Sequence, residues 1–221
     1  RWERKRNSEG LKLFDIAIIG GGLSGSATAA NLSQKGYSVI IFEKNSKGKV
    51  VPCAGGMASS IQKYLPLDIK EALETEVKSV HFSWKYSDKV IAELSGDSPF
   101  CIVKREILDK LLLKKAISYG AVIKTSTHVE GLSNESELWS ITCKNFQKYK
   151  SKFLVIADGS ESEWATKLDL GPSKPKFANT VALRLEGLGN IEKNSVKFDF
   201  GSIKYGFAWA FPLKNSVNIG L

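Results

Sequence analysis

The sequence has few cysteines and no long apolar run. Its three cysteines are an odd number, and no two of them have the spacing of a Cys-x-x-Cys pair. This pattern argues against a disulfide framework and against a zinc site, and it is typical of a reducing compartment. No apolar run approaches the ~20 residues that a transmembrane helix needs. We therefore expect a cytoplasmic protein with no transmembrane helix and no bound metal.

Internal repeats and low-complexity tracts are also absent, and the composition is that of a folded protein. The 221 residues are 43% hydrophobic and 25% charged, which suits one large domain or two smaller ones. The net charge of +9 is spread thinly apart from a basic start. Such a surface attracts phosphates, nucleic acid or anionic lipid. A solvated basic surface is favoured over a nucleic-acid site, and we expect no nucleic-acid partner.

Features at the two ends suggest a piece of a longer chain. Position 1 is arginine, the only methionine is Met57, and residues 216–221 have the pattern of a strand. A natural terminus would seldom fall inside a sheet. We therefore expect a chain that is truncated at its C-terminus.

The clearest local pattern is a strand–turn–helix–strand unit near the start. Residues 13–19 are a continuous apolar run, as in a strand buried on both faces of a parallel sheet. A glycine-rich turn follows, then a helix of small residues that ends near Gly36, then a second strand over residues 37–42. The length of the whole pattern is that of one βαβ unit.

The turn of this unit has the pattern of a dinucleotide-binding motif. Gly20, Gly22 and Gly25 form a GxGxxG motif between strand and helix, and Glu43 follows the second strand. The first glycine permits a tight turn, the second lets the backbone approach a pyrophosphate, and the third lets the helix pack on the strand. Glu43 would accept a hydrogen bond from a hydroxyl of an adenosine ribose. Its negative charge would repel the 2′-phosphate of NADP, so NADP is disfavoured as a ligand. The alternative is a glycine-rich turn that binds nothing, and the motif does not separate FAD from NAD.

A second candidate turn follows the predicted strand over residues 153–157. Asp158 and Gly159 come directly after it, at the carboxyl end of the sheet, where open α/β folds bind ligands. An ordinary turn is the alternative. Residues 105–119 form the second predicted helix, because their apolar residues have helical spacing.

From residue 178 onward the apolar pattern has a period of two, which predicts an antiparallel sheet. Its predicted strands are residues 181–185, 196–200, 207–211 and 217–221. An earlier strand pair, over residues 77–84 and 90–94, is expected to turn at Ser87 and Asp88. Tyr205, Phe207, Trp209 and Phe211 stand at alternate positions, which suits the lining of an apolar slot or, alternatively, an ordinary sandwich core.

These motifs together resemble the FAD-dependent oxidoreductases of the aromatic-hydroxylase fold. The resemblance rests on the GxGxxG motif with its acidic partner, the helix from residue 105 to Gly120-Ala121, and the Ala-Asp-Gly turn. It implies that Asp158 binds the ribityl chain of FAD, that Arg105 approaches the phosphates or the flavin, and that the backbone of Val129 brackets the adenine. Lys44 and Gly159 are expected to belong to the same FAD site.

Two further segments resemble those of the geranylgeranyl reductases. Residues 52–57 (PCAGGM) are similar to their Pro-Cys-Gly-Gly-Gly segment, and residues 205–212 (YGFAWAFP) with 218–220 (NIG) are similar to their Tyr-Gly-Trp-x-Phe-Pro…Asn-Val-Gly signature. This sequence departs from the family pattern in two places. Ala54 replaces a glycine, and the arginine that usually follows the Asp-Gly pair is absent. The substrate contacts that this resemblance implies are Tyr205, Trp209, Phe211 and Pro212.

The cysteine of the first segment is the candidate catalytic residue. By resemblance, Gly55 and Gly56 let the loop approach the isoalloxazine, and Cys53 lies where flavin meets substrate. It would shape the site or relay a proton. The alternative is a small packed hydrophobe.

The resemblance implies an α/β protein with a Rossmann-like FAD-binding domain and an antiparallel substrate-domain sheet. The expected divisions are a basic tail over 1–12, an FAD-binding domain over 13–176 with a β-hairpin near 77–95, and the incomplete sheet over 177–221. The implied activity is FAD-dependent reduction of isoprenoid double bonds, with NAD(P)H or ferredoxin as external donor and with peripheral membrane contact. The alternatives are a flavin monooxygenase that hydroxylates aromatic rings, and a non-catalytic FAD-fold protein that binds prenyl groups.

Overall fold

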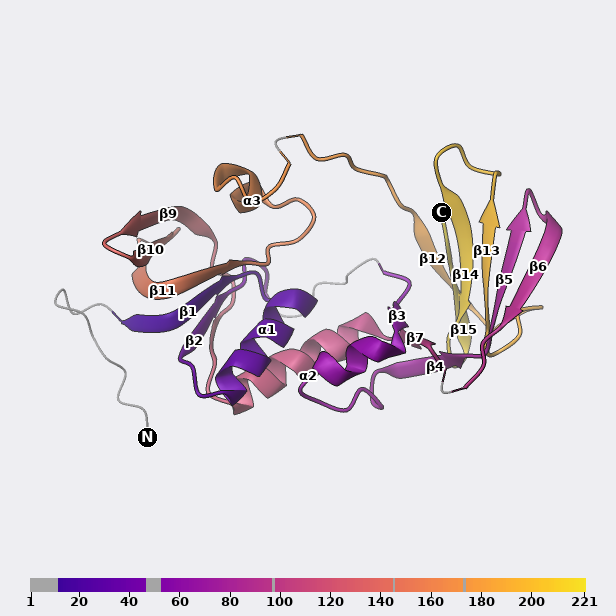
Figure 1. Ribbon diagram of the computed structural model, residues 1–221, viewed down its shortest axis with the longest axis horizontal. Coiled ribbons are helices and arrows are strands. Elements are labelled where there is room, and N and C mark those ends of the chain that lie inside the picture. The colour runs from indigo at the N-terminus through magenta and orange to yellow at the C-terminus, as the bar shows by residue number, and fades with distance from the viewer. Residues whose placement is uncertain (1–11, 47–52, 97, 145, 173) are drawn as a thin grey trace. The chain divides into compact units, whose positions relative to one another are not determined.

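The computed structural model describes residues 12–46, 53–96, 98–144, 146–172 and 174–221, which form two compact units (Figure 1). The first contains the described parts of 1–49, 65–67 and 109–175, and the second those of 50–64, 68–108 and 176–221. These divisions differ from the expected 13–176 and 177–221, because the middle of the chain pairs with the C-terminal strands. Pro52 and the basic start, residues 1–11, lie outside the described residues.

The first unit is built on a six-stranded sheet in the order β8-β2-β1-β11-β10-β9. Its strands are β1 (Leu13–Ile19), β2 (Val39–Phe42), β8 (Val122–Lys124), β9 (Val129–Glu135), β10 (Leu138–Cys143) and β11 (Lys148–Ile156). β8, β2, β1 and β11 are parallel, and β10 and β9 extend the sheet in antiparallel pairs. The apolar run of β1 is therefore central and buried, as the sequence predicts.

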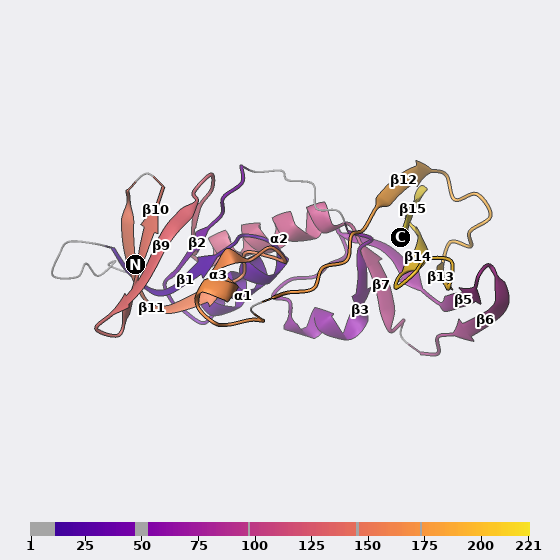
Figure 2. The ribbon, with the colours of Figure 1, turned by 90° about the horizontal axis from the view of Figure 1, so that it is seen from above.

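Helices cover one face of this sheet. α1 (Leu23–Gln34) and α2 (Arg105–Ser118) share one apolar core with that face, to which α1 contributes Ala29 and Ala30 and α2 contributes Ala116 (Figure 2). A second core gathers side chains of β1, β2, β9, β10 and β11, and Trp164 of α3 (Glu163–Lys167) packs against it. Both predicted helices are thus confirmed. No helix within the described ranges is long and apolar enough to cross a membrane.

The second unit has a six-stranded sheet in the order β12-β15-β14-β13-β5-β6. Its strands are β5 (Ser79–Trp84), β6 (Ser87–Glu93), β12 (Ala182–Glu186), β13 (Ser195–Phe200), β14 (Phe207–Pro212) and β15 (Ser216–Gly220). The four C-terminal strands are antiparallel, as predicted, but β13 pairs with β5 in parallel, so the whole sheet is mixed.

The β5–β6 hairpin turns at Lys85 and Tyr86, with φ of 49° and 62°. The predicted turn at Ser87 and Asp88 is wrong, because these residues already belong to β6. Positive φ at both central positions gives the twist that a two-residue hairpin turn requires, although neither residue is glycine or asparagine.

A small three-stranded sheet completes the second unit. It consists of β3 (Gly56–Ala58), β4 (Leu73–Val77) and β7 (Phe100–Val103) in the order β3-β7-β4, with a 3₁₀ helix over Ser59–Tyr64. The core of the unit joins the two sheets through Val77, Ile102, Val196 and Phe211.

Candidate functional site

The expected site residues divide between the two units. In the first unit they are Gly20, Gly22, Gly25, Glu43, Lys44, Val129, Asp158 and Gly159. In the second they are Cys53, Gly55, Gly56, Arg105, Tyr205, Trp209, Phe211 and Pro212. Each group is described within its own unit.

Two glycines of the GxGxxG motif are required by the fold itself. Gly20 has φ +103°, and a Cβ on it would lie 2.2 Å from the carbonyl oxygen of Ala157 at the end of β11. A Cβ on Gly25 would lie 1.9 Å from the carbonyl oxygen of Gly20. Only glycine permits these close approaches, of the turn to the end of β11 and of α1 to the turn, so these two positions would be glycine with or without a ligand.

Gly22 differs, because a Cβ on it would meet no atom within 4 Å. It is the N-cap residue of α1, and the first turn of that helix contains no acidic residue. The unpaired N–H groups and the partial positive charge of a helix N-terminus bind phosphate groups. Gly22 therefore leaves open backbone where the motif predicts a pyrophosphate.

Glu43 lies against the glycine turn. Its Oε2 accepts a hydrogen bond from the N–H of Gly21 at 2.8 Å, and its Oε1 accepts from the backbone N–H and the side-chain amide of Asn45, at 2.8 and 2.9 Å. These bonds fix the carboxylate beside the turn. A carboxylate oxygen can accept a second hydrogen bond, so capacity for a ribose hydroxyl remains on Oε2.

Asp158 supplies an unsatisfied polar atom to the same place. The N–H of Ala157 donates to the carbonyl of Ile19, which holds the end of β11 beside the end of β1. Asp158 follows directly, and its Oδ1 is buried with no hydrogen-bond partner among the described residues. A buried acceptor of this kind costs free energy unless a donor is supplied, which is the expectation for a residue that binds the hydroxyls of a ligand.

Three other expected residues, Val129, Lys44 and Gly159, lie near the ends of the parallel strands or in the segments that follow them. Val129 begins the edge strand β9 with its side chain in the core, and two residues earlier the N–H of Thr127 donates to the carbonyl of Glu43. Lys44 is exposed next to Glu43. Gly159 has φ +97° with open space around it. Asn45, which orients Glu43, is a site residue that the sequence did not reveal, because no motif contains it.

In the second unit, Cys53 and Arg105 are in contact. Arg105 Nη1 lies 3.5 Å from Cys53 Sγ, and the N–H of Gly55 lies 3.4 Å from the same sulfur. Cys53 is exposed. The sulfur accepts in both contacts, so its own S–H is left to donate to a third group.

Packing alone explains both glycines of this loop. Gly55 has φ +83°, and a Cβ on it would lie 2.1 Å from the carbonyl oxygen of Val103. A Cβ on Gly56 would lie 2.7 Å from the ring of Phe100 and 3.0 Å from that of Phe211. Close approach to a flavin is therefore not needed to account for glycine at either position.

Three of the four aromatic residues near the C-terminus, Phe207, Trp209 and Phe211, alternate along β14, and Tyr205 does not belong to the strand. Tyr205 lies in the turn before β14 and is 95% exposed, so the expected alternation along one strand is wrong for it. Trp209 donates from Nε1 to Asn218 at 2.9 Å, and its ring occupies the space that a Cβ on Gly220 would take. Phe211 and Pro212 are buried, with Phe211 in the core of the unit.

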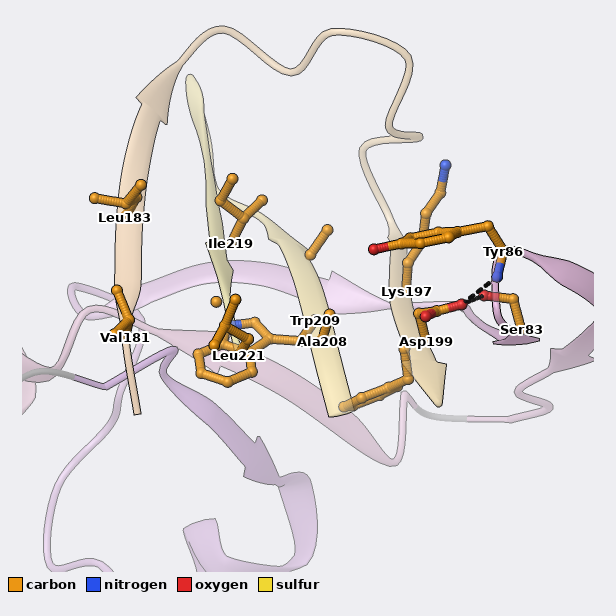
Figure 3. Close-up of a pocket in the computed structure, with 13 residues that line it drawn as sticks. Ser83, Tyr86, Val181, Leu183, Lys197, Asp199, Ala208, Trp209, Ile219 and Leu221 are labelled. Carbon is orange, nitrogen blue, oxygen red and sulfur yellow. Dashed lines mark hydrogen bonds between the residues drawn. The ribbon is translucent and has the colours of Figure 1, made fainter. Parts of the chain in front are cut away.

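The opposite face of this sheet carries a cavity of about 410 Å³ (Figure 3). Its lining is largely apolar, with aliphatic side chains beside Trp209 and Phe198, and Asp199 and Tyr86 border one end. Hydrogen bonds from Ser202 and Ser83 and from the N–H of Tyr86 lower the pKa of Asp199, so this carboxylate is ionised at neutral pH. No sequence motif indicated the network, because its members come from two segments more than 100 residues apart.

Comparison with known proteins finds similar sequences along nearly the whole chain. The model of the FAD dependent oxidoreductase family matches residues 15–98. A digeranylgeranylglycerophospholipid reductase from Methanocella arvoryzae is 31% identical over 94% of this chain and 56% of its own length. An uncharacterized protein from Methanosarcina barkeri is 26% identical over 95% of this chain and 54% of its own length. This chain thus spans about half the length of the curated relatives that it matches.

Solved structures show the same fold. A geranylgeranyl bacteriochlorophyll reductase-like protein from Thermoplasma acidophilum has a TM-score of 0.81 at 22% identity and covers 96% of this chain, which covers 57% of that protein. PqsL from Pseudomonas aeruginosa has a TM-score of 0.78 at 14% identity, with 95% and 60% coverage. The resemblance seen in the sequence is therefore confirmed: along nearly all of its length this chain is similar to the digeranylgeranylglycerophospholipid reductases, and its fold is that of FAD-dependent oxidoreductases.

Proposed function

We propose that this chain is the FAD-binding and sheet-forming part of a reductase that saturates isoprenoid double bonds in a prenyl lipid. The observation that carries the substrate class is the similarity, along 94% of the chain, to proteins named digeranylgeranylglycerophospholipid reductase. The described site supports the cofactor, because it has an open helix N-terminus beside a carboxylate and a buried, unsatisfied acceptor.

The residues of the first unit fit FAD. The N–H groups that follow Gly22 would hold its pyrophosphate, Glu43 would accept from the adenosine ribose, and Asp158 Oδ1 would accept from a hydroxyl of the ribityl chain. The backbone at Val129 would lie against the adenine, since the segment before it is hydrogen-bonded to Glu43. Lys44 adds a positive charge at this end, and Gly159 leaves room for the cofactor after Asp158.

When bound and reduced by an external donor, FAD supplies a hydride for addition to the alkene. The protein then has to hold the alkene, exclude water and provide a proton for the carbon opposite the hydride. Cys53 suits the proton step, because Arg105 and Gly55 orient its sulfur and leave its S–H free to donate. Trp209, Phe211 and Pro212, with Tyr205 ahead of them, would bound the apolar space for the chain. NAD(P)H or ferredoxin is the expected donor.

A flavin monooxygenase is the second candidate, since PqsL, described as a probable FAD-dependent monooxygenase, and the halogenase PltM share the fold. At sequence identities of 14% and 18%, these likenesses show a shared fold and no more. Oxygen uptake that depends on an aromatic substrate would identify a hydroxylase, whereas saturation of an isoprenoid in the absence of oxygen identifies the proposed reductase.

Asp158→Ala tests the cofactor half of the proposal. The variant removes a buried acceptor that has no described partner, so the free energy of unfolding without FAD should stay the same or rise. Affinity for FAD should fall at least about tenfold, the effect of losing one or two hydrogen bonds. Titration of the full-length apoprotein with FAD, followed by flavin fluorescence, measures the affinity. Lower stability with unchanged affinity would show that Asp158 is only a structural residue.

A further inference from the structure

One end of the large sheet in the second unit exposes an unusual number of aromatic side chains. We name this surface the aromatic tip; its members are Trp84, Lys85, Tyr86, Phe200, Lys204 and Tyr205. Exposed fractions are 55% for Trp84, 72% for Tyr86 and 95% for Tyr205. Contiguous exposed aromatic surface on a water-soluble unit marks a contact site for a protein or a membrane.

The aromatic tip is one surface, although it comes from two segments far apart in sequence. β5 and β13 run parallel and end at the same edge of the sheet (Figure 1). The N–H of Lys85 donates to the carbonyl of Phe200 at 2.8 Å, and the ring of Trp84 lies over Gly201, where a Cβ would come within 2.7 Å of it. The turn after β5 and the turn after β13 are therefore packed together.

The tip is also held rigidly. Asp199 Oδ1 accepts from the N–H of Tyr86 at 2.7 Å and from Ser83 at 2.6 Å, while its other oxygen accepts from Ser202. This single carboxylate thus fixes both turns. Tyr86 and Tyr205 have φ of 62° and 59°, a conformation that costs free energy for large side chains. Glycine or asparagine would suit both turns better, so large rings there call for a reason outside the fold.

The chemistry of the tip matches the surface of a lipid bilayer. Trp and Tyr have an apolar ring and a polar atom, and they concentrate at the boundary between lipid and water. Lys85 and Lys204 are exposed beside these rings, as cations that would meet anionic headgroups. Asp199 is buried under the tip. Of the two exposed acids in the hairpin, Asp88 lies near the turn beside Lys89, and Glu93 lies at the far end of β6.

We propose that the aromatic tip docks this protein on an anionic lipid bilayer. The proposal rests on the proposed function, because a prenyl lipid substrate is held in a membrane. Tyr86 also borders the apolar cavity on one face of the same sheet, so docking would bring an apolar space next to the lipid (Figure 3).

The test is sedimentation of the full-length, FAD-loaded protein with vesicles of phosphatidylcholine, with or without phosphatidylglycerol. Tyr86→Asn with Tyr205→Asn removes two exposed rings and suits their positive φ, so folding should be retained. It should lower the partition coefficient roughly tenfold, through lost apolar burial. Lys85→Gln with Lys204→Gln should lower it about 25-fold on anionic vesicles, near fivefold for each lysine, and little on phosphatidylcholine.

The matched control is Phe146→Asn. Phe146 is 86% exposed with φ 59°, and it lies between Lys144 and Lys148 in the first unit, so it tests whether any exposed ring beside lysines binds lipid. The proposal predicts wild-type partitioning for this variant. No vesicle binding by the wild type, equal binding by the tip variants, or a loss shared by Phe146→Asn would overturn it. A change of oligomeric state in the tip variants without a change in lipid binding would also overturn it, in favour of a protein interface.

Failure of this proposal can be separated from failure of the proposed function. The lysine variants should reduce a short, water-soluble prenyl substrate at the wild-type rate. If the wild type binds vesicles but reduces no prenyl substrate, the proposed function is wrong and the docking surface stands. If reduction occurs without vesicle binding, the docking proposal alone fails.

Discussion

At the scale of single residues, the three motif glycines have different reasons to be glycine. Gly20 and Gly25 each occupy a place where a Cβ would overlap a backbone carbonyl, so the fold requires them. Gly22 has open space around it, so the fold does not require glycine there, and we assign this position to cofactor binding. The sequence predicted the motif and its cofactor class, but the separation of fold from binding needed the structure.

This difference predicts opposite effects for two alanine substitutions. Gly25→Ala should lower the free energy of unfolding by about 3 kcal/mol or more, because the methyl group would collide with the carbonyl of Gly20. Gly22→Ala should cost less than about 1 kcal/mol of stability yet weaken FAD binding at least about tenfold. Urea denaturation and FAD titration measure the two quantities. Equal losses of stability in both variants would contradict the assignment of Gly22 to the cofactor.

Cys53 carries the prediction about catalysis. Cys53→Ala and Cys53→Ser should leave reduction of the bound flavin intact and slow saturation of the alkene, by about 10² to 10⁴ if the thiol is the proton donor. Stopped-flow absorbance follows the flavin, and chromatography of the lipid product follows saturation. Arg105→Lys serves as a control for orientation of the sulfur, since it keeps the charge beside Cys53. Unchanged turnover in both cysteine variants would leave Cys53 as a packing residue.

At the scale of elements, Asp15 joins three segments of the first sheet. Its carboxylate accepts from Lys152 of β11 at 2.8 Å and from the hydroxyl and N–H of Ser38, just before β2. Partial burial raises the pKa of Asp15, but the bonds from Lys152 and Ser38 outweigh it and lower the pKa from 3.8 to about 2. Asp15 therefore stabilises the fold above pH 3.8, and this contribution is lost as the pH falls toward 2.

Asp15→Asn should remove that contribution. At neutral pH the variant should be about 2 kcal/mol less stable than the wild type, and the difference should shrink between about pH 4 and pH 2. Urea denaturation of both proteins over this range measures it. A difference that stays constant down to the lowest pH would contradict the role of the ionised carboxylate.

Local elements were predictable from the sequence and distant pairings were not. β1, α1 and β2 are contiguous, and their apolar pattern and glycines determine the unit within 30 residues. The parallel pairing of β13 with β5 joins strands more than 100 residues apart, through contacts such as the N–H of Lys78 with the carbonyl of Asn194. No local pattern records such a pairing. The strands β3, β4 and β7 were missed for the same reason, since each is short and depends on its neighbours.

At the scale of the whole molecule, segments of the two units alternate along the sequence, and the predicted cofactor residues occur in both units. The family resemblance identified them by motif, whereas composition and periodicity alone gave only an α/β unit followed by a sheet. The position of residues 68–108 in the second unit could not be read from the sequence, because their hairpin has the same alternation as any exposed strand pair.

The central proposal is that this chain belongs to an enzyme that adds hydrogen to isoprenoid double bonds through FAD. The most direct measurement is a single turnover without oxygen: the full-length protein, loaded with chemically reduced FAD, is mixed with a geranylgeranyl lipid, and the lipid is analysed by mass spectrometry. The account predicts reoxidation of the flavin together with a lipid that has gained hydrogen and no oxygen. Flavin that stays reduced while the lipid is recovered unchanged would contradict it.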